Sequence, residues 1–272
     1  MADPDLLDVI AHRLLDAFDT RTMLEPMSVS SRDFSGNGGY DVLRRVDAVR
    51  RARGWRTVGR KIGFTNSTLW ERYGVVGPMW AHVWDRTRHL APDGLASIDI
   101  SHFVQPRIEP EIVFSMASTP PVTEDPEEML AHVEWMAAGF EIVQCLFPGW
   151  KFAAADSVAA FGLHGALVVG PPVAVLNENR GGLVGALVKF DATLSRDGSV
   201  VATGSGANVL GSPVRALINF VRLLAEQGSE PLLAGEVVTT GTLTDAQPVV
   251  AGERWTSSYG SLGIEGLDVV FS

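Results

Sequence analysis

From residue 57 onward, the chain consists mainly of short apolar runs separated by turn-forming residues, and this pattern limits the folds available to it. Runs of this kind predict β-strands rather than long helices. A hairpin turn is predicted at Asp197-Gly198. We expect strands over eight segments: Thr57–Phe64, Ile108–Ser115, Gly139–Cys145, Gly165–Val169, Leu183–Leu194, Val200–Ala202, Val237–Thr242 and Leu262–Phe271.

Helical spacing of apolar residues marks the first part of the chain. Leu6, Leu7, Ile10, Leu14 and Phe18 predict an amphipathic first helix. A second helix is expected over Tyr40–Arg53. Within the β-rich part, helices are expected near Asp125-Pro126 (carrying Met129, Val133 and Met136), over Ala154–Ala160, and from Ser212-Pro213 to Leu224. We therefore expect a helical N-terminal portion over residues 1–56, packed on a larger mixed β domain over residues 57–272.

The charge balance bears on possible partners. The chain has 32 acidic and 22 basic residues, a net charge of −10, which argues against general nucleic-acid binding. The stretch from Arg44 to Lys61 is locally basic; a solvated face or an attractor for anionic substrates fits an acidic protein better than a nucleic-acid patch. No signal peptide and no apolar run of membrane-spanning length is visible. The single cysteine, Cys145, allows no internal disulfide, and a soluble, cytoplasmic protein is the expectation.

The lysines are few. Of the 22 basic residues, three are lysines (Lys61, Lys151 and Lys189) and the other 19 are arginines. Only lysine has a pKa that burial can bring into the range of acid/base work. Each lysine therefore attracts attention as a proton-transfer group, although a solvated surface lysine is the ordinary alternative.

The segment Gln105-Pro-Arg-Ile-Glu-Pro-Glu-Ile-Val-Phe114 places two carboxylates one strand period apart. In a strand, Glu109 and Glu111 project from the same face, close enough to reach one hard cation. An exposed polar strand face is the alternative. Pro110 suits an edge strand or a bulge, because it cannot donate to the ladder.

Glu141 is a third carboxylate, alone within the apolar run Gly139-Phe-Glu-Ile-Val143. Burying it is costly unless it is paired or binds a metal. Together with Glu109 and Glu111 it would form an all-oxygen triad suited to Mg²⁺ or Mn²⁺, with positions left for a chelating substrate.

Five segments of the chain form an ordered set: Lys61-Ile-Gly-Phe-Thr65, Gln105-Pro-Arg-Ile-Glu-Pro-Glu111, Phe140-Glu-Ile-Val143, Gly149-Trp-Lys-Phe152 and Ala234-Gly-Glu-Val-Val-Thr-Thr-Gly-Thr242. In this order they resemble the 2-oxopent-4-enoate hydratase and 4-oxalocrotonate decarboxylase family of the fumarylacetoacetate hydrolase superfamily. The resemblance covers nearly the whole chain. It implies an α+β fold with a mixed, rolled β core, a divalent metal and assembly into homo-oligomers, with residues 57–272 as the catalytic domain.

The resemblance also assigns roles by position. It implies that Glu109, Glu111 and Glu141 are the metal ligands and that Lys61 and Asp85 move protons. Thr242 lies in an element found near the substrate.

The sequence departs from the family pattern at Ala160-Phe-Gly-Leu-His164, where many hydratases have a polar stretch. We expect His164 to contact the substrate or act in acid/base chemistry, with a packed core histidine as the alternative. The expected acid after Glu141-Ile-Val is also missing, and Gln144 takes its place.

The implied activity is hydration of a 2-hydroxy-2,4-dienoate, or its 2-oxo tautomer, to a 4-hydroxy-2-oxo acid in aromatic-compound catabolism. A metal-stabilised enolate serves this reaction. The same chemistry would serve a 2-oxo acid decarboxylase or a C–C hydrolase. A catalytically silent partner subunit is the alternative outside enzymes. The partner expected in each enzyme case is a small-molecule 2-oxo acid, not nucleic acid or membrane.

Overall fold

The computed structural model describes residues 4–30, 34 and 36–272. None of the helices in this part of the chain is both long enough and apolar enough to cross a membrane. The α-helices are α1 (Pro4–Thr20), α2 (Met27–Ser30), α3 (Gly36–Ala52), α4 (Trp70–Tyr73), α5 (Pro126–Leu130), α6 (Ala154–Ala159), α7 (Arg180–Lys189) and α8 (Pro213–Glu226).

The strands contribute to two sheets over the described residues. They are β1 (Thr57–Gly63), β2 (Met79–Trp84), β3 (Arg88–Leu90), β4 (Leu95–Ile98), β5 (Arg107–Met116), β6 (Val133–Val143), β7 (His164–Val169), β8 (Val173–Ala174), β9 (Asp191–Arg196), β10 (Ser199–Ser205), β11 (Val237–Thr239), β12 (Gln247–Pro248), β13 (Arg254–Ser258) and β14 (Asp268–Phe271). Short 3₁₀ turns lie between them at Ser67–Leu69, Pro148–Trp150, Phe161–Leu163, Gly206–Asn208 and Gly260–Leu262.

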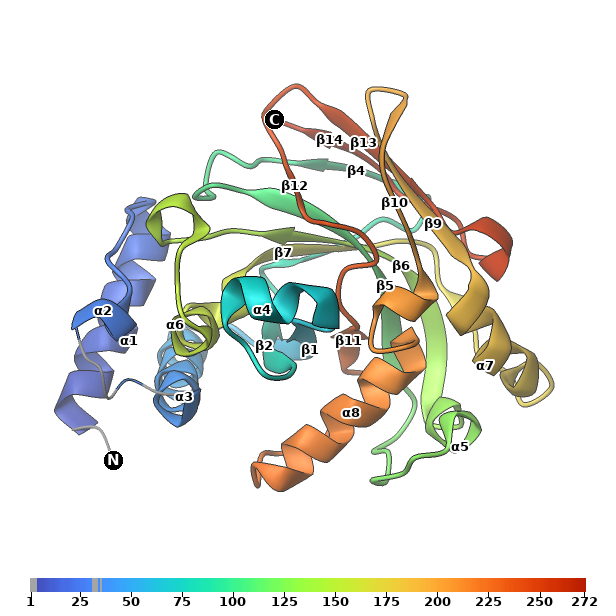
Figure 1. Cartoon of the computed structure of the whole chain (residues 1–272), viewed down its shortest axis with the longest axis horizontal. Helices are drawn as coiled ribbons and strands as arrows, with labels where there is room; N and C mark the ends of the chain where they lie inside the picture. The colour runs from blue at the N-terminus through green and yellow to red at the C-terminus, as the bar shows by residue number, and fades with distance from the viewer. Residues whose placement is uncertain (1–3, 31–33, 35) are drawn as a thin grey trace.

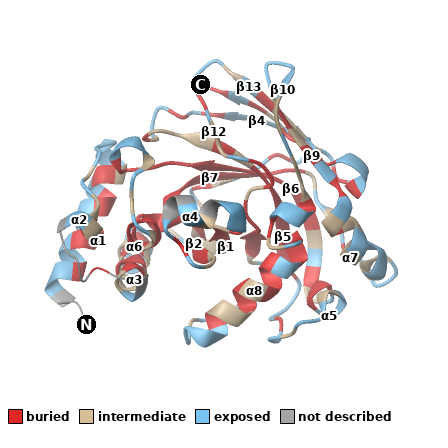
Figure 2. Ribbon diagram, in the orientation of Figure 1, coloured by how far each residue is buried: buried red, intermediate tan, exposed pale blue. Residues whose placement is uncertain are grey.

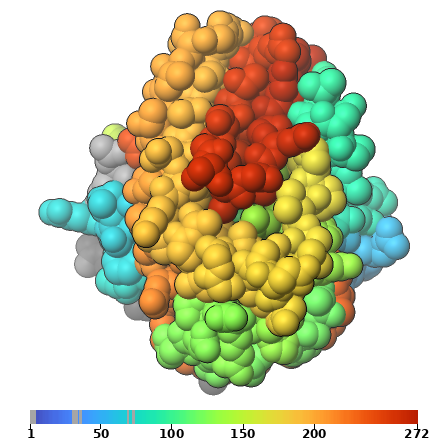
Figure 3. All heavy atoms as spheres, turned by 90° about the vertical axis from the view of Figure 1, so that its right-hand side faces the viewer, coloured from blue at the N-terminus to red at the C-terminus, as the bar shows by residue number. Residues whose placement is uncertain are grey.

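The larger sheet is mixed and has the order β2-β1-β11-β5-β6-β7-β3, with β12 beside β5 and β8 beside β6. The smaller sheet has the order β10-β9-β13-β14-β4. Figure 1 shows the long central strands curving under the smaller sheet, with helices at the two flanks. In Figure 3 the C-terminal segment (red) lies between the β9–β10 hairpin (gold) and the β4 region (teal), as the strand order requires. The α+β class with a rolled mixed β core, implied by the family resemblance, is confirmed.

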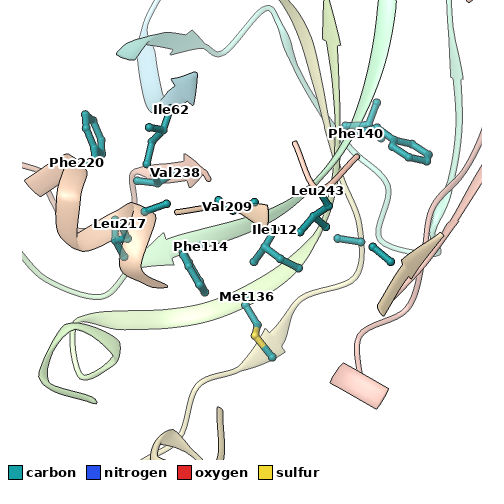
Figure 4. Close-up of a cluster of buried hydrophobic side chains, with 14 of the residues drawn as sticks. Ile62, Ile112, Phe114, Met136, Phe140, Val209, Leu217, Phe220, Val238 and Leu243 are labelled. Atoms are coloured by element: carbon teal, nitrogen blue, oxygen red, sulfur yellow. The ribbon is translucent and has the colours of Figure 1, made fainter. Parts of the chain in front are cut away.

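The main core lies between the larger sheet and α8. Figure 4 shows Leu217 and Phe220 of α8 directed toward Ile62, Phe114 and Val238 of the sheet. These side chains are at most 1% exposed. Figure 2 shows the central strands buried and the outer faces of the flanking helices exposed. Burial of this apolar surface stabilises the curved sheet that carries the site, at about 25 cal/mol per Å².

The N-terminal helices pack on the β domain through a second apolar cluster. Leu7, Leu14 and Val46 share this cluster with Phe147 and Phe161. Helices α1, α2 and α3 lie within the range expected to form a helical N-terminal portion, and through this cluster they share buried surface with the rest of the described chain.

Arg50 of α3 is enclosed by aromatic rings within this cluster. Its guanidinium lies 4.0 Å from the ring centroid of Trp84 and 4.5 Å from those of Trp55 and Phe161. The residue is 2% exposed, and its two Nη atoms have no hydrogen-bond partner among the described residues. Burial lowers the pKa of Arg50 to about 9. The rings replace part of the hydration of this cation through cation–π attraction.

The other basic residues from Arg44 to Lys61 are each paired with a carboxylate of the same chain. The pairs are Arg44–Asp41, Arg45–Asp8, Arg51–Asp47, Arg53–Asp19, Arg56–Asp85, Arg60–Glu236 and Lys61–Glu141. Arg44, Arg51, Arg53 and Arg56 are exposed, which agrees with the solvated-face interpretation, and their charges are in addition balanced by carboxylates of the same chain.

Several expected elements differ from the structure, among them the strand expected over Val237–Thr242, which ends at Thr239. Residues 180–189 form helix α7 where a strand was expected, because Leu183, Val184 and Leu187 also fit one helix face, and only the residues from Asp191 onward are extended. The helix expected to carry Val133 and Met136 ends at Leu130, and both residues lie in β6. The last strand begins at Asp268 rather than Leu262.

Candidate metal centre and active site

Glu109, Glu111 and Glu141 lie together on adjacent central strands. Glu109 of β5 is directly opposite Glu141 of β6, and Glu111 follows two positions along β5 on the same face. One carboxylate oxygen from each of the three lies within 4.8 Å of the others. Glu111 and Glu141 are both 0% exposed. The alternative of an exposed polar strand face is therefore wrong.

A gap in the strand ladder makes room for the site beside Pro110. β11 pairs with residues 113–115 of β5, and β12 pairs with residues 107–108. Between them, a loop rather than a strand faces β5, so no ladder hydrogen bond requires the backbone N–H that Pro110 lacks. On the other side, β5 pairs regularly with β6 at this position. The expectation of an edge or a bulge at Pro110 is corrected: it lies in an interior strand, opposite an interruption in its neighbour.

Gly241 lets that loop approach the carboxylates. Its backbone N–H donates to Oε2 of Glu111 at 2.8 Å. Its φ is +101°, and a Cβ there would lie 1.8 Å from Oγ1 of Thr65. Only glycine combines this backbone conformation with this close contact.

Lys61 of β1 reaches the carboxylates from the side. Its Nζ lies 3.2 Å from Oε2 of Glu141 and donates to the carbonyl oxygen of Gly162 at 3.0 Å. The residue is 4% exposed. Gly162 has φ +63°, which turns its carbonyl toward the ammonium.

The charges of this cluster shift one another's pKa values. Burial raises the pKa of Glu111 well above its usual value, and the neighbouring carboxylates add to this; burial raises the pKa of Glu109 to about 7, against the attraction of Lys61. Burial also acts to raise the pKa of Glu141, but Lys61 and the hydrogen bond from His164 lower it overall. Burial acts to lower the pKa of Lys61, but the three carboxylates outweigh it and raise it. Lys61 is thus protonated, and the triad is short of positive charge.

A cavity of about 240 Å³ opens onto this cluster. Glu109 and Lys61 reach its wall, with Glu111 and Glu141 buried behind them. Thr242, which the family resemblance implies to lie near the substrate, lines the cavity, and its hydroxyl donates to the carbonyl oxygen of Thr244 at 2.7 Å. The remaining wall residues are Ile62, Gly63, Phe64, Thr65, Asn66, Met79, Arg107, Val143, Trp150, Phe152, Gly162, Leu163, Gly241, Asp245, Ala246 and Gln247.

Asp85 is not part of this wall, contrary to the expectation that it moves protons with Lys61. It follows the end of β2, four residues beyond Ala81, the residue paired with Lys61. Its carboxylate accepts from the backbone N–H and Nε of Arg56, both at 3.0 Å. These bonds lower the pKa of Asp85. Spacing along the sequence suggested a shared site, but the antiparallel pairing of β1 and β2 carries Asp85 away from it.

His164 does not line the cavity either, so the expected substrate contact is corrected. Its ring is fully buried, with Nδ1 2.8 Å from Oε1 of Glu141 and Nε2 2.8 Å from Oγ1 of Thr87. Burial lowers its pKa, against the pull of Glu141. The residue contacts the carboxylate cluster from behind.

Sequence reasoning assigned no role to Arg107. It lines the cavity, and its guanidinium stacks 4.2 Å from the ring centroid of Trp150. The available signal was strand alternation, because Arg107, Glu109 and Glu111 occupy every second position of β5. Arg107 supplies a cation suited to a substrate carboxylate.

The donor set fits a hard divalent cation. Oε1 of Glu111 and Oε2 of Glu141 are buried and have no hydrogen-bond partner in the described part of the chain, although Lys61 lies close to the latter. A buried carboxylate oxygen without a partner, such as Oε1 of Glu111, is costly, and Lys61 alone does not balance three carboxylates. An oxygen-coordinated Mg²⁺ or Mn²⁺ would satisfy both needs.

Comparison with known proteins gave matches along most of the chain, although no protein-family model matched. The chain is 34% identical to a 4-oxalocrotonate decarboxylase of a Pseudomonas species, over 82% of this chain and 83% of that protein. It is 28% identical to the 2-hydroxyhexa-2,4-dienoate hydratase of Comamonas testosteroni, over 97% of each.

Solved structures share the fold. The 4-oxalocrotonate decarboxylase of Pseudomonas putida G7, complexed with magnesium and adipate, has a TM-score of 0.90 at 24% identity and covers 100% of this chain and 99% of its own. The fumarylpyruvate hydrolase of Pseudomonas aeruginosa, in complex with Mn²⁺ and pyruvate, has a TM-score of 0.55 at 16% identity, over 79% of this chain and 89% of its own.

Proposed function

Because the chain belongs to the 2-keto-4-pentenoate hydratase and 4-oxalocrotonate decarboxylase family, we propose that it is a divalent-metal-dependent hydro-lyase acting on a 2-hydroxy-2,4-dienoate. The product would be a 4-hydroxy-2-oxo acid of aromatic-compound catabolism. The observation that carries the proposal is the triad of Glu109, Glu111 and Glu141 behind a cavity that also receives Lys61.

The three glutamates would hold Mg²⁺ or Mn²⁺. When bound, the cation would act as a Lewis acid that stabilises an enolate of the 2-oxo acid. Relatives whose structures are described as complexes with magnesium or Mn²⁺ support this assignment.

Lys61 is proposed as the proton donor at the cavity. Its Nζ reaches the cavity wall, and its contacts with Gly162 and Glu141 fix its direction. A donor held this way protonates an enolate carbon or oxygen without searching for its orientation. Asp85 has no place in this proposal, because its carboxylate is held by Arg56 outside the cavity.

Arg107 is proposed to hold a substrate carboxylate on the same side of the cavity as Trp150. The ring restricts the guanidinium, so less side-chain freedom is lost when an anion binds.

Decarboxylation of a 2-oxo dicarboxylate is the second candidate. The 34% identical relative is named a decarboxylase, and the same enolate stabilisation would release carbon dioxide from a substrate with a suitably placed carboxylate. C–C hydrolysis rests only on the shared fold of a hydrolase at 16% identity. The intact triad and Lys61 speak against a silent partner subunit.

The test uses purified full-length protein with 2-hydroxypenta-2,4-dienoate or 4-oxalocrotonate, with Mg²⁺ or with chelator. Loss of the dienol absorbance without release of carbon dioxide supports the hydratase. Carbon dioxide release from 4-oxalocrotonate, without turnover of the dienoate, supports the decarboxylase. Metal-independent turnover, or none on either substrate, overturns the proposal.

Two variants test the residue roles. Lys61→Met should lower kcat by about 100-fold or more, as expected for loss of a general acid. Lys189→Met is the matched control, because Lys189 is an exposed lysine at the end of α7 and should leave kcat unchanged. Glu109→Gln should abolish Mn²⁺ binding as well as turnover; intact binding contradicts the ligand assignment.

Assembly into a cytoplasmic homo-oligomer belongs to the proposal too, on the basis of the family resemblance. Light scattering of the purified protein tests the assembly, and a monomer at assay concentrations contradicts it.

A further inference from the structure

We propose that His164 and Thr87 form a positioning pair that fixes the carboxylate of Glu141 from behind, so that its second oxygen is presented to the cation. This inference rests on the proposed metal site. It gives His164, the residue at which the sequence departs from the family pattern, a role outside the cavity.

The contacts are short and buried. His164 begins β7, and its ring lies between Glu141 of β6 and the turn after β2. Nδ1 is 2.8 Å from Oε1 of Glu141, and Nε2 is 2.8 Å from Oγ1 of Thr87. The side chains of His164 and Glu141 are both 0% exposed, so water does not compete for these bonds.

The partners specify one tautomer of the ring. An ionised carboxylate only accepts, so Nδ1 of His164 must carry a proton. The backbone N–H of Trp84 donates to Oγ1 of Thr87 at 3.3 Å, which leaves the threonine O–H free to donate to Nε2.

The alternative orientation of the Thr87 hydroxyl is less favourable. If the hydroxyl donated to the carbonyl oxygen of Trp84 at 3.1 Å, Nε2 would need its own proton and the ring would be a buried cation. Arg50 already places one buried cation 4.0 Å from the ring centroid of Trp84, and that centroid lies 6.2 Å from the centroid of His164. The neutral Nδ1–H tautomer avoids a second one.

These contacts determine the direction of the second carboxylate oxygen of Glu141, Oε2. With Oε1 held by His164, the carboxylate cannot turn to exchange its two oxygens. Oε2 then remains directed at Lys61, 3.2 Å from Nζ, and at the other carboxylates. A histidine that fixes a ligand carboxylate in this way acts on metal affinity, and loss of such outer contacts commonly weakens binding by about 10–100-fold.

The experiment measures Mn²⁺ binding to full-length protein, without substrate, by electron paramagnetic resonance of free Mn²⁺. His164→Leu should raise the Kd by about 10–100-fold. His164→Asn should restore most of the affinity, because its amide N–H can take the place of Nδ1–H. Thr87→Val, which removes only the hydroxyl, should raise the Kd by several-fold, and Thr87→Ser should bind like the unchanged protein.

The outcomes separate this inference from the proposed function. If the unchanged protein does not bind Mn²⁺, the metal site itself is overturned and the inference with it. If it binds, and the folded Leu and Val variants bind within about twofold of it, the positioning pair alone is overturned. If His164→Asn binds Mn²⁺ no better than His164→Leu, the positioning pair is also overturned, because lost packing of the ring would then explain the weaker binding.

A spectroscopic signature tests the tautomer directly. In the ¹⁵N spectrum of histidine-labelled protein at pH 8, the resonances lost in His164→Asn should be those of an Nδ1–H ring. An Nε2–H or imidazolium pattern for these resonances overturns the assignment.

Discussion

Replacing Lys61 by methionine should destabilise the metal-free protein strongly, because it removes the cation from a buried cluster of carboxylates. Lys61 and Glu141 are 4% and 0% exposed, with Nζ and Oε2 3.2 Å apart. At an effective dielectric constant of about 20, Coulomb attraction at this distance is about 5 kcal/mol. Removing one partner of a buried pair leaves the other charge uncompensated, at a cost of about 3–5 kcal/mol.

The pH dependence of this effect follows from the pKa shifts. The pKa of Glu141 is lowered, so its stabilising contribution is present above its usual value of 4.5 and is lost as pH falls through the folded pKa. The pKa of Lys61 is raised, so its contribution is present below its usual value of 10.5 and is lost as pH rises through the folded pKa. The cost of Lys61→Met should therefore be largest near neutral pH and shrink in acid, where Glu141 protonates.

The assay is urea unfolding in the presence of chelator, at pH 7 and at a series of pH values below 4.5, where Glu141 titrates. The double variant Lys61→Met with Glu141→Gln should recover about 2 kcal/mol or more of the cost relative to the sum of the single variants, because no charge is left alone. Lys189→Met serves as the control for loss of an exposed lysine. A cost below about 1 kcal/mol for Lys61→Met, or strict additivity in the double variant, would refute this reasoning.

Three further predictions concern metal binding and packing. Mn²⁺ affinity should rise between pH 6 and pH 8, because the pKa of Glu109 is raised to about 7 and its proton competes with the metal; isothermal titration calorimetry checks this, and a flat profile contradicts it. Gly241→Ala should lose Mn²⁺ binding by at least about tenfold, whereas Gly252→Ala, also at positive φ but in open space, should not; equal effects would indicate backbone strain alone. Arg50→Lys should lower the free energy of unfolding by about 2 kcal/mol, since an ammonium fits the aromatic cage less well; Arg53→Lys, half-exposed, should change it little, and similar urea midpoints for both would contradict the cage's role.

Local pattern was sufficient where a residue's environment follows from its own strand. Alternation along β5 placed Glu109 and Glu111 on one face, and the apolar run around Glu141 indicated burial; both inferences agree with the structure. Alternation would also have marked Arg107, but a single cation beside carboxylates has many ordinary explanations. For residues 180–189, the apolar spacing fitted a helix and a strand alike, and only packing beside α5 and α8 distinguishes them.

Roles that depend on contacts between distant segments were not determined by local pattern. Asp85 and Lys61 lie on neighbouring strands, yet antiparallel pairing sends Asp85 to Arg56. The sequence marked His164 as a departure from the family pattern. The orientation of its ring, however, depends on the pairing of β7 with β6 and on the position of Thr87 after β2.

Short-range periodicity and composition by themselves determined a helical first part followed by a larger β-rich part, the net negative charge and the carboxylates that share one strand face, and the family resemblance implied the rolled β core. Only the tertiary structure decided which lysine is paired with Glu141, which groups reach the cavity, and which histidine nitrogen faces the carboxylate. The physical reason is that charge pairing and hydrogen bonding act over a few ångströms in space, and β-sheet topology sets those distances between residues that are far apart in the chain.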